Sequence, residues 1–441
     1  MNTNFKIPVV EKKLIIPFIL ITSLFALWGF ANAVTDPMVQ AFKKVLELTN
    51  SQAAWVQMAF YGGYFCMALP AALFVRKYTY KYGIIVGLSL YAFGALLFYP
   101  ATVTEEFWFF CLGLYVLTFG LAFLETTANP YILAMGHPKT AIRRLNLAQA
   151  FNPVGLVLGL LVAKYFVLDQ LQSDDYENFG ALDQAKKALI RTSDLMVIRD
   201  PYVILGLVVL AVLVVILISK MPQAKDRDGI VSVKNTFSTL IKNKRYAYGV
   251  VSLVMYMGAQ IMCWTYIYQY AEGMGISASI AANYQLLAFI LFTVGRIIGT
   301  YLLKFISSTK LLMYFAFAGM FCALITIFVA GVAGLYALTC ISLFLSIMFP
   351  TIYGIALDGL KEEDAKIGAA GLVMAIVGGA LLPQFQGMLI DLGGVGVDDI
   401  KILGVSEVNF SFILPALCFL VVIIYAWDMT KRIALHVNHS N

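Results

Sequence analysis

Ionisable side chains that interrupt apolar runs are the residues of this sequence whose chemistry most needs an explanation. Four of them lie well inside such runs: Asp36, Glu125, Lys164 and Arg296. A charged group in the hydrocarbon of a bilayer is costly, so each is a functional candidate by default. Carboxyl groups in this setting can bind and release protons, whereas cations tend to pair with carboxylates or backbone carbonyls.

Glu125 is the clearest of the four, because no Lys or Arg lies near it on its own run. A helix rises about 1.5 Å per residue, which puts Glu125 about 28 Å from the outer end of that run, in the inner half of the membrane. Desolvation disfavours the charged form of an unpaired carboxyl, so Glu125 should be neutral part of the time. We therefore predict a proton carrier. The competing interpretation is a permanently protonated glutamic acid that hydrogen-bonds one helix to another.

The other three ionisable residues allow more than one interpretation. Asp36 lies near the outer half of its run, before Pro37, and is either a second proton-binding carboxyl or the mark of a helix end. Arg296 is expected to contact a carboxylate or helix carbonyls near the inner face, as a gating or structural residue or as a ligand contact. Lys164 lies near an outer helix end, where a long side chain usually reaches back to the interface.

Uncharged polar side chains are concentrated on a few of the runs. Amides present paired donors and acceptors, which suits the ring of hydroxyl groups on a sugar. Hydrogen bonding between helices is the competing role for some of them. The predicted substrate-binding residues of this kind are Asn32, Asn146, Gln149, Asn152, Gln260, Asn283 and Tyr284.

Two of the five tryptophans lie deep inside runs, at Trp28 and Trp264. The other three lie at span ends, as in the aromatic belt of a membrane protein. An aromatic face can hold the apolar face of a sugar ring while amides bind the hydroxyls. We therefore include Trp28 and Trp264 among the predicted substrate-binding residues, with core packing as the competing explanation for each.

Membrane-spanning helices are the elements that must position these residues. Of the 441 residues, 61% are hydrophobic and 13% are charged, which is too apolar for a soluble protein. Spanning a bilayer takes about 20 apolar residues as a helix, and barrel strands would be shorter and would alternate in polarity. We predict an all-α membrane protein with twelve transmembrane helices. The runs cover residues 14–40, 52–75, 82–101, 106–135, 145–168, 201–220, 246–271, 280–304, 310–330, 333–357, 367–391 and 408–428.

Charge placement predicts the orientation of these helices. Most of the 31 Lys and Arg residues fall at the termini and in the even-numbered gaps, so the positive-inside rule puts both termini in the cytoplasm. The basic gap 221–245 would then link two six-helix bundles, residues 1–220 and 246–441. Such a division is typical of transporters with a midplane site between two repeats. The long outer gap 169–200 is expected to form a short surface helix.

Several functional classes are disfavoured by the same sequence. The net charge of +6 is spread over short gaps between apolar runs, which argues against nucleic-acid binding. The sequence has no phosphate-binding loop, nucleophile–base set or metal-ligand cluster, so we predict a non-enzyme without a metal or a cofactor other than a coupling proton. All six cysteines lie inside apolar runs and are expected to pack rather than form disulfides.

Several of these residues lie in stretches that resemble the L-fucose permease family of the major facilitator superfamily and its glucose/galactose relatives. The resemblance runs through both halves of the chain, and the block around the fourth and fifth helices is the most specific. The matching stretches are Leu27-Trp28 to Asp36, Leu124-Glu125-Thr126 to Pro130, Arg144 to Asn152, Gly258 to Trp264, Ala282-Asn283-Tyr284 and Gly295-Arg296.

The resemblance implies proton-coupled sugar uptake by alternating access. We expect a protein that works as a monomer in a bacterial inner membrane. The resemblance carries the paired carboxyls of the family onto Asp36 and Glu125, and the central polar contact of the fifth helix onto Asn152. L-fucose is the leading expected substrate, followed by galactose, glucose or an amino sugar. The alternatives are an efflux antiporter for drugs or metabolites and a non-transporting sugar sensor.

The sequence departs from the family pattern at positions where sugar contacts are expected. Ala33 and Thr35 stand where fucose permeases carry asparagines, and Met348-Phe349 stands where Gln-Tyr is expected. We therefore expect transport to be kept while some hydroxyl contacts are lost or moved.

Overall fold

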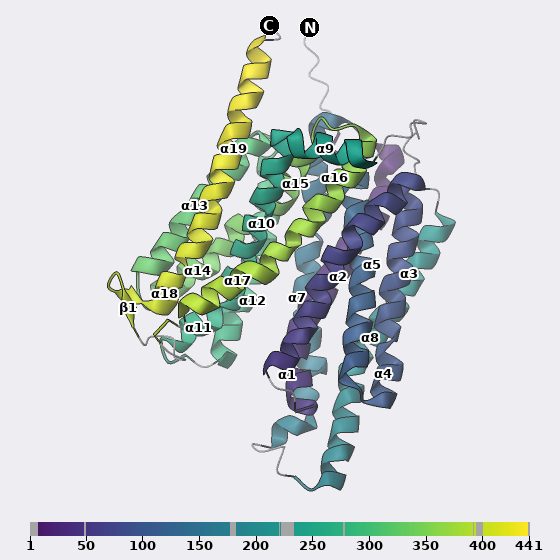
Figure 1. The fold of residues 1–441 in the computed structure, drawn as a ribbon, viewed down its shortest axis with the longest axis vertical. Coiled ribbons are helices and arrows are strands. Elements are labelled where there is room, and N and C mark those ends of the chain that lie inside the picture. The colour runs from purple at the N-terminus through teal and green to yellow at the C-terminus, as the bar shows by residue number, and fades with distance from the viewer. Residues whose placement is uncertain are drawn as a thin grey trace. The chain divides into compact units, whose positions relative to one another are not determined.

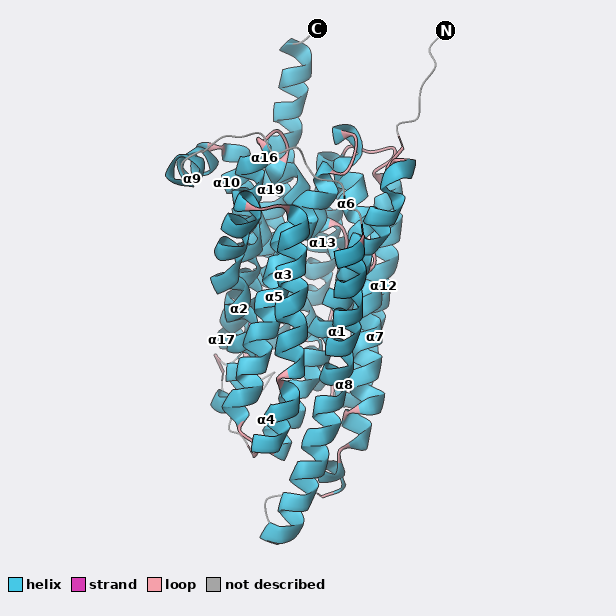
Figure 2. Cartoon of the chain, turned by 90° about the vertical axis from the view of Figure 1, so that its right-hand side faces the viewer, coloured by secondary structure: helices cyan, strands magenta, loops and turns pink. Residues whose placement is uncertain are grey.

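Helices make up almost all of the protein, as Figure 2 shows. A computed structural model describes residues 8–47, 50–176, 182–219, 221, 233–276, 278–390, 392–393 and 400–439. Within this part of the chain, 12 helical segments are long and apolar enough to cross a membrane, which confirms the predicted number. These spans are Lys12–Thr35, Ala59–Lys77, Tyr80–Thr104, Phe107–Ala134, Pro138–Phe166, Gln184–Ile218, Lys244–Glu272, Asn283–Leu302, Ser308–Phe328, Val332–Leu357, Asp364–Ile390 and Glu407–Arg432.

The chain packs into two compact units. The first, which we call the amino unit, contains residues 11–132 and 151–228, and the second, the carboxyl unit, contains residues 1–10, 133–150 and 229–441. Residues 133–150 therefore group with helices of the second half of the sequence, although they belong to its first half. The predicted division at residues 220 and 245 stays a prediction.

The amino unit is a bundle in which α1 packs along α7 and α3 along α8 (Figure 1). Short 3-10 turns precede α1 and follow α7. The helices of this unit are α1 (Ile15–Val45), α2 (Asn50–Lys77), α3 (Tyr80–Leu96), α4 (Phe98–Thr104), α5 (Phe107–Ala134), α7 (Asn152–Phe166) and α8 (Gln184–Ile218).

The carboxyl unit holds the remaining helices and one small hairpin. In it α13 packs on α19, α10 packs on α17 and α19, and α6 packs on α15 and α12. Strands β1 (Lys401–Ile402) and β2 (Val405–Ser406) pair antiparallel, with Lys401 opposite Ser406. The helices are α6 (Ala141–Gln149), α9 (Val233–Lys242), α10 (Lys244–Thr265), α11 (Ile267–Glu272), α12 (Ala278–Leu302), α13 (Ser308–Phe328), α14 (Val332–Leu345), α15 (Met348–Leu357), α16 (Glu362–Met374), α17 (Gly378–Ile390), α18 (Glu407–Ser411) and α19 (Ile413–His439).

Prolines explain why some spans are built from two helices. A proline ring clashes with the carbonyl four residues before it and cannot donate a hydrogen bond to it. Helix α3 ends at Leu96, four residues before Pro100, and α6 ends at Gln149, four residues before Pro153. The break between α14 and α15 likewise falls just before Pro350. The break at Gln149 matters most, because it separates two helices that carry predicted site residues.

The expected short surface helix in the gap 169–200 is wrong, because residues 184–200 belong to α8 (Gln184–Ile218), the helix of the sixth span. Helix α8 begins at Gln184, where the Asp183 side chain accepts a hydrogen bond from the backbone N–H of Ala185 and caps the helix. The buried Asp194 side chain accepts from the backbone N–H groups of Gln172 and Ser173, at 2.8 and 2.9 Å. These bonds hold the preceding 3-10 turn, Gln172–Asp175, against α8.

Two glycines let α1 and α7 approach almost backbone to backbone. A Cβ atom added at Gly29 would collide with the carbonyl oxygen of Asn152, and one added at Gly155 would collide with the carbonyl oxygen of Ala26. Small residues at helix interfaces allow such close approach in membranes. The contact fixes α7, and therefore Asn152, directly beside the stretch of α1 that carries Trp28.

A larger side chain at Gly155 should separate these helices. We expect Gly155→Leu to lower the free energy of unfolding by more than about 3 kcal/mol, because a backbone collision costs more than ordinary overpacking. Thermal unfolding in detergent measures this. Gly62→Ala is the matched control, since a Cβ there meets only a Tyr115 ring atom at 3.8 Å. Equal stability of the Gly155→Leu variant and wild type would contradict the packing described.

Candidate functional site

The amino unit holds Trp28 inside an aromatic and hydrogen-bonded setting. Trp28 is buried, its ring lies 5.2 Å from that of Phe25, and its Nε1 donates to the Tyr64 hydroxyl at 3.0 Å. Tyr64 on α2 is itself buried. The indole is therefore held in one orientation by a partner on a neighbouring helix, and its placement serves packing as well as any contact with a substrate.

Two amides lie beside this tryptophan on the closely packed α1 and α7. Asn152 is half-buried at the start of α7 and donates from Nδ2 to the carbonyl oxygen of Phe25 at 3.3 Å. Asn32, one helical turn after Trp28, is half-buried, and its side-chain oxygen is buried with no hydrogen-bond partner among the described residues. A buried acceptor that no protein group satisfies is suited to a hydroxyl donor from a ligand or to water.

Glu125 lies in the interior of α5 and is only 9% exposed. Its backbone carbonyl accepts a hydrogen bond from Asn129, but no ion pair or hydrogen bond of its carboxyl occurs among the described residues. The sequence places no cation next to Glu125 on its own helix, and no described side chain of another helix forms an ion pair with it. Burial without a cation favours the neutral carboxyl and permits a change of protonation.

The other predicted proton-coupling residue, Asp36, belongs to α1, but its side chain lies outside the described residues. Its assignment stays a prediction.

In the carboxyl unit, Arg296 on α12 contacts the end of α6. Its Nη1 donates to the side-chain oxygen of Gln149 at 3.2 Å and to the Gln149 carbonyl oxygen at 3.5 Å. The guanidinium carbon lies 5.0 Å from the centre of the Phe292 ring. Arg296 is 3% exposed, and its Nε has no hydrogen-bond partner among the described residues. The predicted carbonyl partner is present, and the predicted carboxylate does not occur in the described part of the chain.

A second hydrogen bond joins α6 to α15. Asn146 donates from Nδ2 to the Thr351 hydroxyl at 3.3 Å and to the carbonyl oxygen of Ile142 at 3.0 Å. A Cβ added at Gly354 would touch the Ile142 side chain, so the two helices are also close there. Asn146 and Gln149 are both buried. Asn146 donates to α15 and Gln149 accepts from α12, while the side-chain oxygen of Asn146 is buried and has no hydrogen-bond partner among the described residues.

The remaining predicted residues of this unit lie in different surroundings. Trp264 on α10 donates from Nε1 to the Ser342 hydroxyl at 3.0 Å and packs edge-on against Phe289 and Phe292. Phe292 also contacts Arg296, so an aromatic cluster connects the indole to the guanidinium. The other three, which no described contact brings together, are Gln260, buried on α10, Asn283, exposed on α12, and Tyr284, half-buried against Tyr336.

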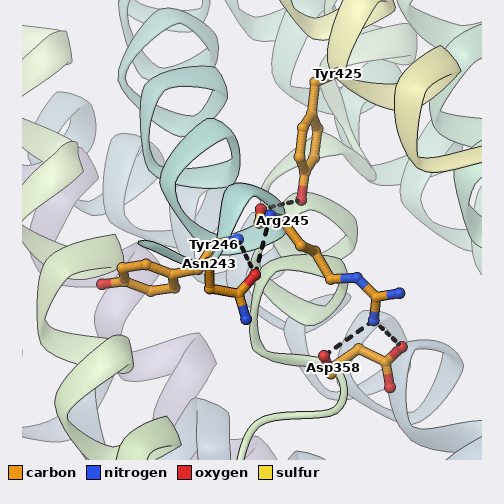
Figure 3. Close-up of polar contacts among 5 residues, drawn as sticks. All are labelled: Asn243, Arg245, Tyr246, Asp358 and Tyr425. Carbon is orange, nitrogen blue, oxygen red and sulfur yellow. Dashed lines mark hydrogen bonds and ion pairs between the residues drawn. The ribbon is translucent and has the colours of Figure 1, made fainter. Parts of the chain in front are cut away.

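A polar cluster fixes the start of α10, as Figure 3 shows. Asn243 caps the helix by accepting from the backbone N–H groups of Arg245 and Tyr246. The Arg245 guanidinium donates to Asp358 just after α15, at 2.8 Å to the carboxylate and 3.0 Å to the carbonyl oxygen, and Tyr425 of α19 donates to the Arg245 carbonyl oxygen. Because the ion pair is partly exposed, it contributes little energy and mainly sets geometry.

Sequence reasoning missed Tyr64 and Thr351, which bind two of the predicted residues. Neither is charged, and each lies in an apolar run, so composition gives no reason to single it out. The one signal near Tyr64 is the Gly62-Gly63 pair, which indicates close packing of that helix on a neighbour.

A family model now settles which family this chain belongs to: the Major Facilitator Superfamily model matches residues 18–383. This chain is a member of the Major Facilitator Superfamily. The structural comparison agrees, because a superfamily transporter, FucP, solved in the outward conformation, superimposes with a TM-score of 0.85 at 34% identity, over 95% of this chain and 99% of that one.

Two curated relatives within the superfamily extend over nearly the whole chain. An L-fucose-proton symporter of Haemophilus influenzae is 54% identical over 432 residues, which is 96% of this chain and 99% of the relative. An L-fucose-proton symporter of Escherichia coli is 34% identical over 422 residues, covering 94% of this chain and 93% of the relative. The predicted family is confirmed.

The contact between α12 and α6 generates a prediction about local stability. We expect Arg296→Ala to release the end of α6, because hydrogen bonds to a charged group contribute about 1.5–3 kcal/mol. Amide hydrogen exchange over residues 141–149 should then accelerate about tenfold or more. Lys304→Ala, which removes an exposed cation two residues after the end of α12, is the control. Unchanged exchange in the Arg296→Ala variant would show that α6 is held by other contacts.

Proposed function

We propose that this protein takes up L-fucose together with a proton by alternating access across a bacterial inner membrane. The proposal joins the family membership, the two curated L-fucose-proton symporters that match nearly the whole chain, and the buried carboxyl of Glu125. The single observation that carries it is that carboxyl, buried without a cationic partner among the described residues. In this proposal the proton is the coupling ion, and no cofactor takes part.

We place the sugar contacts in the amino unit. Asn32 has a buried oxygen ready to accept from a hydroxyl group, and Asn152 lies on the helix packed against it. Trp28 supplies an apolar surface next to both. We assign these three residues to L-fucose, with Asp36 as a second carboxyl on the same helix. The assignment of Gln260, Trp264, Asn283 and Tyr284 to the sugar stays a prediction.

Coupling follows from linkage between the two ligands. If protonated Glu125 favours sugar binding, the sugar must favour protonation of Glu125 by the same factor. A proton gradient then drives sugar accumulation, because the site loads at the more acidic face and unloads at the other. Hydrogen bonds from Arg296 to Gln149 and from Asn146 to Thr351 hold α6 in the described arrangement, and we assign them to gating.

The finer points of topology belong to the same proposal. Both termini lie in the cytoplasm, the segment 221–245 links two six-helix bundles, and the protein works as a monomer in the lipid bilayer. The basic residues of the even-numbered gaps support this orientation. Drug or metabolite efflux gains no support, since the curated relatives carry the names of sugar transporters.

Removing the ionisable group tests the proton site. Glu125→Gln should abolish L-fucose accumulation driven by a pH gradient and leave sugar exchange in counterflow intact, because a neutral amide resembles the protonated carboxyl but cannot release a proton. Radiolabelled fucose in proteoliposomes measures both. Glu272→Gln, at an exposed carboxyl, serves as the control. Wild-type accumulation by the Glu125→Gln variant would remove Glu125 from the mechanism.

Loss of the amide on α7 tests the sugar site. Asn152→Ala should weaken fucose binding about tenfold, the effect expected when a sugar hydroxyl loses one hydrogen-bond partner. Fucose-dependent calorimetry on the purified variant measures the affinity. Gln170→Ala removes an exposed amide that also donates to a backbone carbonyl, and it should bind as wild type does. Equal affinities of the two variants would argue against a sugar contact at Asn152.

A further inference from the structure

We propose that Pro153 is a positioning residue for transport, because it opens the carbonyl oxygen of Gln149 to Arg296 and so lets α6 move separately from α7. The inference rests on the proposed function, in which the contact between α6 and α12 belongs to the gate. Pro153 is none of the predicted site residues. It acts only through the backbone, at the break inside the fifth span, Pro138–Phe166.

The break between α6 and α7 takes away the usual helical donor of one carbonyl oxygen. In a continuous helix the N–H of residue 153 would donate to the carbonyl oxygen of Gln149, but a proline has no N–H. The Ala150 N–H is instead shared between the carbonyl oxygens of Asn146 and Leu147, at 3.0 and 3.3 Å, which tightens the end of α6. Proline at position 153 therefore opens the Gln149 carbonyl oxygen to a donor from another element.

Arg296 on α12 is such a donor. Its Nη1 donates to the carbonyl oxygen of Gln149 at 3.5 Å and to the side-chain oxygen of the same residue at 3.2 Å. Arg296 is 3% exposed and forms no ion pair with a carboxylate among the described residues. The carboxyl end of a helix carries partial negative charge, so the end of α6 is a favourable partner for this buried cation. The guanidinium thus binds a helix end that exists because Pro153 interrupts the span.

The two halves of the fifth span are held by different neighbours. Asn152 of α7 donates to the carbonyl oxygen of Phe25 on α1 at 3.3 Å, and Gly155 brings the backbones of these two helices into contact. Helix α6 packs on α12 and α15 and belongs to the carboxyl unit, whose boundary falls between residues 150 and 151. A continuous helix would force α6 to follow α7. The break lets α6 leave α12 and α15 while α7 stays on α1.

Alternating access gives this freedom a function. In the proposed mechanism the sugar binds at Asn152, and the hydrogen bonds from Arg296 to Gln149 hold the gate. Only three positions along the chain separate Gln149 from Asn152, so a rigid helix would carry every movement of the gate into the sugar contact. With the break, the gate opens while Asn152 keeps its place beside α1.

A double-mutant cycle in detergent tests whether Pro153 acts through Arg296. Pro153→Ala restores an N–H that can donate to the Gln149 carbonyl oxygen, so Arg296 should contribute less to stability. The shift in the midpoint of thermal unfolding caused by Arg296→Ala should fall by about half in the Pro153→Ala background. Pro201→Ala is the control, because Pro201 lies inside the unbroken α8. A shift that Pro153→Ala leaves unchanged, or that Pro201→Ala reduces as much, overturns the proposal.

Transport kinetics test whether the break serves the gate. In proteoliposomes that contain the full chain, Pro153→Ala should lower the maximal rate of fucose counterflow about tenfold and change the fucose affinity less than about twofold, because Asn152 keeps its place on α7. Pro201→Ala should keep both values. A wild-type maximal rate in Pro153→Ala, or an affinity that falls by the same factor as the rate, overturns the role in transport.

Two further arms keep the result decisive. If Pro153→Ala does not fold, Pro153→Gly introduces the same N–H, and the same outcomes decide. The unfolding cycle uses no sugar, so it decides the link between Pro153 and Arg296 whatever the protein carries. Absence of fucose transport by the wild-type protein would overturn the proposed function instead.

Discussion

A carboxyl group held in a low-dielectric interior without a cation is the constraint on which this structure depends. Glu125 is buried in α5, and no ion pair is made by its side chain in the described part of the chain. Burial of an unpaired charge is expensive, so the group favours its neutral form unless donors surround the ionised one. A protein can keep such a residue only where the change between the two forms is useful or where the neutral form is permanent.

Helices α1 and α7 of the same unit pack so closely that their contact has no room for larger side chains. Gly29 and Gly155 bring α1 and α7 together, and Pro153 ends the preceding helix so that Asn152 begins a new one beside α1. Trp28 and Asn32 lie on the same stretch of α1. Small movements of α1 would therefore alter the positions of the indole and both amides together, since a packed interface shifts as a unit instead of deforming residue by residue.

Much of this could be predicted from the sequence, for identifiable reasons. The number of spans follows from hydropathy, because lipid leaves backbone groups no partners outside a helix. Glu125 is evident because charge inside an apolar run is rare. What could not be predicted depends on contacts between distant segments: the Tyr64 partner of Trp28, the Thr351 partner of Asn146, and the extension of α8 back to Gln184. Periodicity and composition say nothing about which neutral side chains meet.

If Glu125 couples the proton to the sugar, its carboxyl changes protonation when the sugar binds. Infrared difference spectroscopy of the reconstituted protein, recorded with and without L-fucose, reports carboxyl protonation directly. We expect a sugar-induced change in the carbonyl band of a protonated carboxylic acid that is absent from the Glu125→Gln variant. Identical difference spectra from the two proteins, under conditions where both bind fucose, would contradict it.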